Sequence, residues 1–382
     1  MKIAIISPWT ISESVVGGTE RFVIDLANSL KNLNNEIDVY MLQGKNFIKN
    51  SINFISLDLW KNGNYIDENV IDKLFGNFQS EDSFIKIAEE LEELINWKKY
   101  DLIQLNSLLF LKTFKNSNRI FTIHTNPFEY ELAYKKQGFE IMTKIMKEES
   151  KVANTIFVAP SKYYANEYSK IIDNEVYNIP HAIDIKRLAS IKNDNTFLEK
   201  YNIAKNKRHI LLPSRLEPVQ KQPMLFMKAF AKFDSETKSN YQIICGGSDE
   251  QYSIYKEDIE NYCNKNDINI NILKFDNNEM GEAYNNSDIV VLPSKSESFG
   301  YAALESLCLG IPTILNNIPT YMEVTEDAEN SFIFNGTEES LYNKLNYVIK
   351  NKIKRKKQKD IWYNKYNPEL FGKRYLNLLE RK

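Results

Sequence analysis

Short apolar runs alternate with helical hydrophobic patterns along most of this chain. Lys2 to Ser7 has the near-continuous apolar character of a buried strand. From Thr19 to Leu30 apolar residues recur at helical spacing, and Glu36 to Leu42 again predicts a strand. A second helical stripe covers residues 84–95, and further strands are predicted at 101–105, 119–124 and 155–159. This alternation is typical of a parallel sheet with helices on both faces.

The alternation restarts after a polar stretch at 182–205 that lacks a strong period. Strands are predicted at 209–213, 241–245, 268–275, 288–292 and 312–315, with helices at about 223–233, 279–286 and 301–309. We therefore predict an α/β protein with two Rossmann-like, doubly wound domains, residues 1–185 and 186–360. The aromatic-rich segment 361–382 should form a C-terminal helix that packs back toward the N-terminal domain.

Composition narrows the function classes. The chain has 382 residues, enough for two domains, and a formal net charge of −2, which argues against a nucleic-acid binder. No run of apolar residues is long enough for a membrane span, and the first apolar run is too short for a signal peptide, so we expect a cytoplasmic protein. The chain has three cysteines and three histidines, which argues against a disulfide framework or a metal site.

A basic run from Lys350 to Lys359 contains seven Lys or Arg residues. We interpret it as a solvated surface, which is what most charge runs are. The alternative is a weak peripheral contact with anionic lipid headgroups, which would place the protein at the inner face of the membrane.

The segment from Ser294 to Glu305 carries the strongest chemical signal. It follows an apolar strand and opens a helix, whose unpaired backbone N–H groups and positive dipole end favour an anion such as a diphosphate. Gly300 would let a ligand approach the backbone closely. Glu297 and Glu305 could accept hydrogen bonds from sugar and ribose hydroxyls. Taken alone, they fit a capped helix with a surface charge equally well.

The surrounding pattern makes this segment more specific. The segment reads Pro293-Ser294-x-x-Glu297-Ser298-Phe299-Gly300, has Glu305 eight positions after Glu297, and is followed by Leu309-Gly310-Ile311-Pro312-Thr313. This pattern resembles the signature of glycosyltransferase family 4. The resemblance implies retaining enzymes with two Rossmann-like domains facing a central cleft, the glycosyltransferase B-type architecture. It assigns the donor sugar to Glu297 and the ribose to Glu305. It also implies that the donor phosphate binds at the start of the helix, at Ser298, Phe299, Gly300 and Tyr301.

Other positions agree with this resemblance. Ser214-Arg215-Leu216 and Lys221 resemble the family's cation pair that neutralises the donor diphosphate, although the family usually has Gly at the positions of Ser214 and Gln222. Two cations on a loop suit a dianion, and Arg can bind it through two hydrogen bonds.

Three more sites come from the family pattern. Gly17-Gly18 resembles its N-terminal glycine loop, which faces the donor phosphate and the acceptor. Gly246 would lie near the nucleotide. His124, at the end of a predicted strand, would hydrogen-bond the donor sugar near the reacting carbon, whereas a lone His is otherwise structural, as we interpret His181.

The implied activity is transfer of a sugar from a nucleoside diphosphate sugar, with UDP favoured, to an acceptor hydroxyl with retention. Such a reaction serves glycan, polysaccharide or glycoconjugate biosynthesis. Arg215, Lys221 and the helix start would stabilise the leaving diphosphate without a metal or a cofactor. The acceptor could be a sugar, a lipid-linked molecule, a protein or a small molecule. Two alternatives stay open: a sugar phosphorylase or nucleotide-sugar epimerase on the same fold, and a non-catalytic sugar-nucleotide-binding partner protein.

Overall fold

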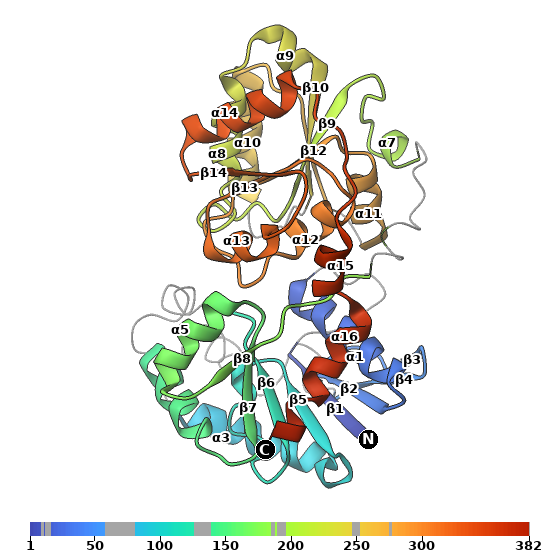
Figure 1. Ribbon diagram of the computed structural model, residues 1–382, viewed down its shortest axis with the longest axis vertical. Helices are drawn as coiled ribbons and strands as arrows, with labels where there is room; N and C mark the ends of the chain where they lie inside the picture. The colour runs from blue at the N-terminus through green and yellow to red at the C-terminus, as the bar shows by residue number, and fades with distance from the viewer. Residues whose placement is uncertain are drawn as a thin grey trace. The chain divides into compact units, whose positions relative to one another are not determined.

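A computed structural model describes residues 1–8, 11, 17–57, 81–125, 139–184, 188, 196–246, 253–274 and 277–381 (Figure 1). The chain divides into two compact units. Unit 1 comprises Met1–Ala182 together with Tyr366–Lys382, and unit 2 comprises Ile183–Lys365. Each unit is built on one largely parallel sheet, which confirms the predicted fold class.

The sheet of unit 1 has the strand order β3-β4-β2-β1-β5-β6-β7-β8. The strands are β1 (Lys2–Ser7), β2 (Glu36–Met41), β3 (Phe47–Lys49), β4 (Ile52–Ser56), β5 (Leu102–Leu105), β6 (Arg119–Thr122), β7 (Thr155–Ala159) and β8 (Val176–Asn178). Neighbouring strands run parallel except in the β3–β4 hairpin. Its turn residues, Asn50 and Ser51, both have positive φ, as a two-residue hairpin loop requires.

The helices of unit 1 bury apolar stripes against this sheet. They include α1 (Gly18–Asn32), α3 (Asp82–Leu94), α5 (Lys162–Ile172) and α16 (Pro368–Leu376), with short 3-10 turns at η2 (Trp97–Lys99), η3 (Leu108–Phe110) and η5 (Leu379–Arg381). On α1, Phe22, Val23, Leu26, Ala27 and Leu30 are buried, as the sequence pattern predicts.

Among its described residues, unit 2 has one sheet of six parallel strands in the order β11-β10-β9-β12-β13-β14. They are β9 (Arg208–Pro213), β10 (Tyr241–Gly246), β11 (Ile270–Leu273), β12 (Ile289–Leu292), β13 (Thr313–Asn316) and β14 (Ser331–Phe334). The predicted strand 268–275 extends to Phe275, which lies outside the described residues.

Helices lie on both faces of this second sheet (Figure 1). They are α7 (Thr196–Lys200), α8 (Pro223–Ala231), α9 (Ser235–Asn240), α10 (Ser253–Lys265), α11 (Asn277–Asn285), α12 (Tyr301–Cys308), α13 (Pro319–Thr325), α14 (Glu338–Lys350) and α15 (Asp360–Lys365). The core between α8, α10, α14 and the sheet is formed by aliphatic and aromatic side chains such as Phe226, Phe230, Ile259 and Leu345.

Both sheets reverse their winding direction at one point. In unit 2 the chain adds β10 and β11 on one side of β9 and then β12, β13 and β14 on the other side. The reversal therefore lies between β9 and β12. In unit 1 the reversal lies between β1 and β5. Ligands of open α/β sheets bind beyond the carboxyl ends of the strands at such a switch point. The two switch points are therefore where functional side chains should be sought.

The C-terminal helix α16 packs against α1. Ser29 Oγ contacts the Pro368 carbonyl and accepts a 2.8 Å hydrogen bond from the Gly372 backbone N–H. A Cβ atom at Gly372 would lie 2.7 Å from Ser29 Oγ, so glycine is required for this close approach. The Phe371 ring packs edge-on against Phe22 at 5.7 Å between centroids. Residues from the end of the chain therefore complete the core of unit 1.

The basic run is partly anchored to unit 2. Lys356 and Lys359 form ion pairs with Glu329 at 2.6 and 3.4 Å, and Arg355 donates to backbone carbonyls at the end of α11, including that of Asn285. The other four cations, at positions 350, 352, 354 and 357, are exposed. In the described parts of the chain no helix has the length and apolar character needed to cross a membrane. Contact of the run with lipid stays a prediction.

Candidate functional site

Two loops meet at the switch point of unit 2. One follows β9 and runs from Ser214 to Gln222, and the other follows β12 and runs from Pro293 to Gly300. The Lys295 backbone N–H donates to the Gln220 carbonyl at 2.7 Å, and the Gln220 side-chain amide donates to the Ser296 carbonyl at 3.2 Å. These bonds fix the loops against each other, so side chains that lie far apart in the sequence share one site.

The carboxylate of Glu297 is held by three donors on one oxygen. Its Oε1 accepts hydrogen bonds from Lys221 Nζ at 2.7 Å, Ser294 Oγ at 2.8 Å and Tyr321 Oη at 3.1 Å. Both members of the Lys221–Glu297 pair are mostly buried, with side chains 14% and 15% exposed. None of the described residues donates to the second oxygen, Oε2. The carboxylate is thus oriented with one oxygen available for a ligand.

Tyr321 supports both Glu297 and the start of α12. It lies on α13 and is fully buried. Burial, with the Glu297 carboxylate as the next contribution, raises the pKa of Tyr321, so its hydroxyl remains a proton donor. A Cβ atom at Gly300 would lie 2.8 Å from Tyr321 Cε1, and Gly300 has φ +97°. Both the space and the backbone conformation therefore require glycine at this position.

The loop that presents Lys221 is closed by Glu217. The Glu217 carboxylate accepts the backbone N–H groups of Val219 and Lys221, each at 3.1 Å, as well as that of Gln220. Gln222, which precedes α8, has a left-handed backbone conformation with φ 49°. Glutamine here adopts a conformation that glycine would adopt at lower cost. Neither Glu217 nor Tyr321 was among the predicted site residues.

Arg215 does not join this cluster. It follows β9 directly, its side chain is exposed, and it makes no ion pair or hydrogen bond with a described residue. Of the two predicted diphosphate-binding cations, the structure therefore brings Lys221 to Glu297 and leaves the Arg215 guanidinium in solvent.

The remaining predicted residues of unit 2 surround the same loops. Gly300 caps α12 with its backbone, and the Phe299 side chain is buried against the ring of Tyr301 at 5.8 Å. Ser298 is half-buried. Glu305 lies on α12 beside Tyr284, whose pKa is raised by burial and further by the Glu305 charge. Gly246 ends β10 in register with Pro213, the last residue of β9.

In unit 1, His124 lies at the carboxyl edge of the sheet. It follows β6, and its ring packs edge-on against Phe22 at 4.6 Å between centroids. Its Nε2 lies 3.2 Å from Oδ1 of Asn106, which follows β5. Burial lowers the pKa of His124 to about 3, so the imidazole is neutral at ordinary pH. The structural role predicted for His181 fits its burial against Phe22, at 4.8 Å between ring centroids.

The glycine pair Gly17-Gly18 begins α1. Gly17 is the N-cap and has no side chain to accept the helix N–H groups. The Glu20 carboxylate folds back to this end, since a Cβ atom at Gly17 would lie 2.0 Å from its Oε2. A negatively charged side chain at a helix N-terminus is favourable. A bound phosphate at this end would have to displace it.

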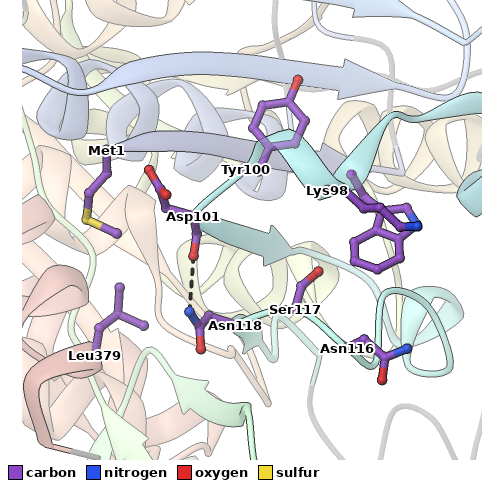
Figure 2. Close-up of a pocket in the computed structure, with 9 residues that line it drawn as sticks. Met1, Lys98, Tyr100, Asp101, Asn116, Ser117, Asn118 and Leu379 are labelled. Carbon is purple, nitrogen blue, oxygen red and sulfur yellow. Dashed lines mark hydrogen bonds between the residues drawn. The ribbon is translucent and has the colours of Figure 1, made fainter.

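A cavity of about 740 Å³ in unit 1 lies at the opposite edge of the sheet (Figure 2). Its lining residues come from the chain just before β1, β5 and β6 and from η5: Met1, Trp97, Lys98, Tyr100, Asp101, Asn116, Ser117, Asn118 and Leu379. The Asn118 amide donates to the Asp101 carbonyl at 3.3 Å. None of the predicted site residues lines this hollow. Among the described residues, no group of three or more His, Cys, Asp or Glu side chains is placed to hold a metal ion.

Comparison with protein families accounts for both units. Residues 193–366 match the family model described as glycosyl transferases group 1, and residues 16–187 match the model described as glycosyltransferase family 4. The chain belongs to these glycosyltransferase families. The resemblance noted in the sequence is thereby confirmed, and this chain is a sugar-transferring enzyme.

Individual relatives and a solved structure extend the comparison. The glycosyltransferase is 23% identical over 396 residues to an alpha-1,3/1,6-mannosyltransferase of Dictyostelium discoideum, a match that covers 94% of this chain and 91% of the relative. It is 38% identical over 66 residues to an O-antigen biosynthesis glycosyltransferase of Escherichia coli, a match that covers 17% of this chain and 18% of that protein. Its fold is similar to that of Anabaena HepE, solved in complex with UDP-glucose, with a TM-score of 0.73, 16% identity and full coverage of both chains. These matches support a glycosyltransferase B-type fold.

Proposed function

We propose that this glycosyltransferase takes a sugar from a UDP-sugar bound at the switch point of unit 2 and transfers it to an acceptor hydroxyl with retention. The observation that carries this proposal is the Lys221–Glu297 pair, because it places a cation and an oriented carboxylate where α/β sheets bind nucleotides. The UDP-glucose complex of the Anabaena neighbour supports the choice of donor. The Escherichia coli relative supports a role in polysaccharide or glycoconjugate biosynthesis.

The proposed division of labour follows the contacts. The diphosphate would take Lys221 as a partner, together with Arg215 and the backbone N–H groups at the start of α12. Lys221 now neutralises Glu297, so an incoming diphosphate competes for the same ammonium group. Glu297 would then hold a sugar hydroxyl through Oε2, while Ser294 and Tyr321 keep Oε1 in place. Glu305 would accept the ribose hydroxyls.

The proposed reaction needs charge stabilisation more than it needs a nucleophile. The bond between the anomeric carbon and the phosphate oxygen breaks, and the acceptor oxygen bonds to the same face of that carbon. The acceptor proton passes to the leaving diphosphate. Lys221, Arg215 and the helix N–H groups would stabilise the negative charge that develops, with no metal ion required. His124 would contact a sugar hydroxyl as a neutral imidazole.

The remaining assignments concern the ends of the substrates. Gly246 would lie beside the nucleotide base, and Gly17-Gly18 would leave room for the donor phosphate and the acceptor. If the acceptor is lipid-linked, the exposed cations of the basic run would contact the anionic membrane surface that carries it, because each lysine near such a surface adds a modest attraction.

Nucleoside diphosphate release tests the activity directly. The full chain is incubated with a panel of nucleoside diphosphate sugars, and free nucleoside diphosphate is measured. Release from a UDP-sugar is the expected result. No release and no binding across the panel would contradict the proposal. Turnover that requires inorganic phosphate would identify a phosphorylase, and an isomerised donor without release would identify an epimerase.

Removal of the proposed ribose ligand tests the site. We expect Glu305→Ala to weaken UDP binding about tenfold or more, because a charged hydrogen-bond acceptor is lost. Glu339→Ala, on the exposed surface of α14, is the matched control and should bind UDP like the unmodified protein. Equal affinity in the Glu305→Ala variant would refute the role given to Glu305.

A further inference from the structure

Three neighbouring strands of unit 1 bring Asn106 and His124 together. β1, β5 and β6 lie side by side in the sheet, and Asn106 and His124 follow the carboxyl ends of β5 and β6. Asn106 is 2% exposed and lies at the switch point between β1 and β5. Its amide contacts the backbone of β1 on one side and the imidazole on the other. Asn106 lies in no recognisable sequence motif, because its partners come from strands distant in the chain.

The contacts of Asn106 determine which way its amide points. The Ile6 backbone carbonyl lies 3.1 Å from Nδ2 and can only accept a hydrogen bond, so the amide nitrogen must face it. Oδ1 consequently faces His124 Nε2, at 3.2 Å. A carbonyl oxygen can only accept, so Nε2 must carry the hydrogen atom.

The other ring nitrogen is then fixed by chemistry. A neutral imidazole has one N–H group, so Nδ1 presents a lone pair and can only accept a hydrogen bond. Burial favours this neutral form. The His181 ring lies 5.9 Å from the His124 ring between centroids, and burial also lowers the pKa of His181.

A series of hydrogen-bonded buried polar groups supports the Asn106 amide. Gln104 Nε2 lies 3.4 Å from Asn106 Oδ1 and 2.7 Å from Thr122 Oγ1. Thr122 Oγ1 in turn lies 3.0 Å from the hydroxyl of Tyr375, on α16. Hydrogen-bonded networks of buried groups hold their members in one arrangement. The C-terminal helix therefore contributes to the orientation of Asn106 in addition to covering α1.

We propose that Asn106 is a positioning residue that fixes His124 in its Nε2–H tautomer, so that Nδ1 accepts a hydrogen bond from a hydroxyl group of the sugar substrate. The identification of the ligand as a sugar rests on the proposed function, whereas the assignment of the tautomer does not. The assignment has a specificity consequence: a substrate that replaces the contacted hydroxyl by fluorine cannot donate to Nδ1 and should be used less well.

Nuclear magnetic resonance of the full chain, labelled with 15N-histidine, tests the tautomer without any substrate. The His124 signals are identified by their loss in His124→Gln. We expect Nε2 to resonate as a protonated nitrogen and Nδ1 as an unprotonated one. In Asn106→Leu, which removes the acceptor, the two tautomers should mix, while Asn106→Asp keeps an acceptor and should preserve the Nε2–H form. A protonated Nδ1 in the unmodified protein would overturn the proposal, as would an unchanged tautomer in Asn106→Leu.

Kinetics with a donor sugar separate positioning from simple structural damage. Asn106→Leu should lower kcat/KM about tenfold, the loss expected for one misdirected hydrogen bond, while its thermal unfolding remains cooperative. Asn106→Asp keeps an oxygen toward His124 and loses the donor to the Ile6 carbonyl, so it should recover part of the rate, and its charge should raise the pKa of His124, which moves the 15N titration to higher pH. Asn118→Asp, at an exposed position of the same unit, is the matched control for the added charge.

The kinetic outcomes distinguish two failures. A full rate in Asn106→Leu would overturn the positioning role. Absence of turnover in the unmodified protein would overturn the proposed function and leave the tautomer measurement valid.

Discussion

At the scale of single residues, the two oxygens of Glu297 differ sharply. Oε1 accepts three hydrogen bonds, from an ammonium group and two hydroxyls, and Oε2 accepts none from the described residues. Charge-assisted hydrogen bonds are strong and directional, so the carboxylate is held in one orientation before any ligand arrives. Preorganisation of this kind lowers the cost of placing a substrate.

Tyr321→Phe tests this orientation with the smallest change. The ring and its contact with Gly300 remain, while the hydroxyl that donates to Glu297 is lost. A hydrogen bond to a charged group contributes about 1.5–3 kcal/mol, so we expect kcat/KM to fall by roughly 10- to 100-fold. Steady-state kinetics with the best donor of the panel measures this. Tyr363→Phe removes a hydroxyl that donates to the Cys308 carbonyl instead, and it should leave the rate unchanged.

Sequence predicted some of these residues and not others. Glu297 and Lys221 are recognisable because each lies in a local pattern at the end of a strand. Tyr321 contacts Glu297 across 24 positions of sequence, from a helix that carries no motif. Asn106 acquires its contacts from strands that are neighbours in the sheet and far apart in the chain. Such contacts depend on strand order, which hydrophobic patterns alone do not determine.

At the scale of elements, the sequence predicts the buried strands and misses the exposed ones. β1, β9 and β12 are buried along nearly their whole length, and their continuous apolar runs made them predictable. The β3–β4 hairpin and the edge strand β14 are partly exposed, with mixed composition, and the pattern did not reveal them. The periodicity of α1 was predicted because one face is buried and the other solvated.

The contact of α16 with α1 gives a test at this scale. Phe371 is fully buried against Phe22, whereas its neighbour Leu370 is 37% exposed. Truncation of a buried Phe to Ala costs about 3–5 kcal/mol, so Phe371→Ala should lower the free energy of unfolding by that amount. Leu370→Ala should change it by less than about 1 kcal/mol. Urea unfolding of both variants measures the difference, and equal costs would show that α16 does not complete the core of unit 1.

At the scale of the whole molecule, two sheets with the same winding provide two switch points. Predicted residues gather at both: Lys221 and Glu297 in unit 2, and His124 in unit 1. Strand order thus explains how residues far apart in the sequence come together within each unit. It also explains why the large cavity at the amino ends of the unit 1 strands contains none of the predicted residues.

The stability of the molecule should fall in mild acid. Burial lowers the pKa of His124 to about 3 and lowers that of His181, so the folded protein keeps both rings neutral where the unfolded chain protonates them. The unfolded state then binds more protons, and the free energy of unfolding decreases as pH falls below about 6.5. Urea midpoints measured from about pH 7.5 to 5.5 should decline. The decline should be smaller in His124→Gln, and a midpoint that rises on acidification would contradict the assigned burial.

Calorimetric titration of UDP into the full chain tests the central claim that a nucleoside diphosphate binds at the switch point of unit 2. Lys221→Gln removes the cation that lies beside Glu297, and Lys228→Gln removes an exposed cation from the adjacent helix α8. We predict that UDP binds the unmodified protein and Lys228→Gln with the same Kd, and binds Lys221→Gln at least about tenfold more weakly. Equal affinity of all three proteins for UDP, or no affinity in any of them, would contradict the claim.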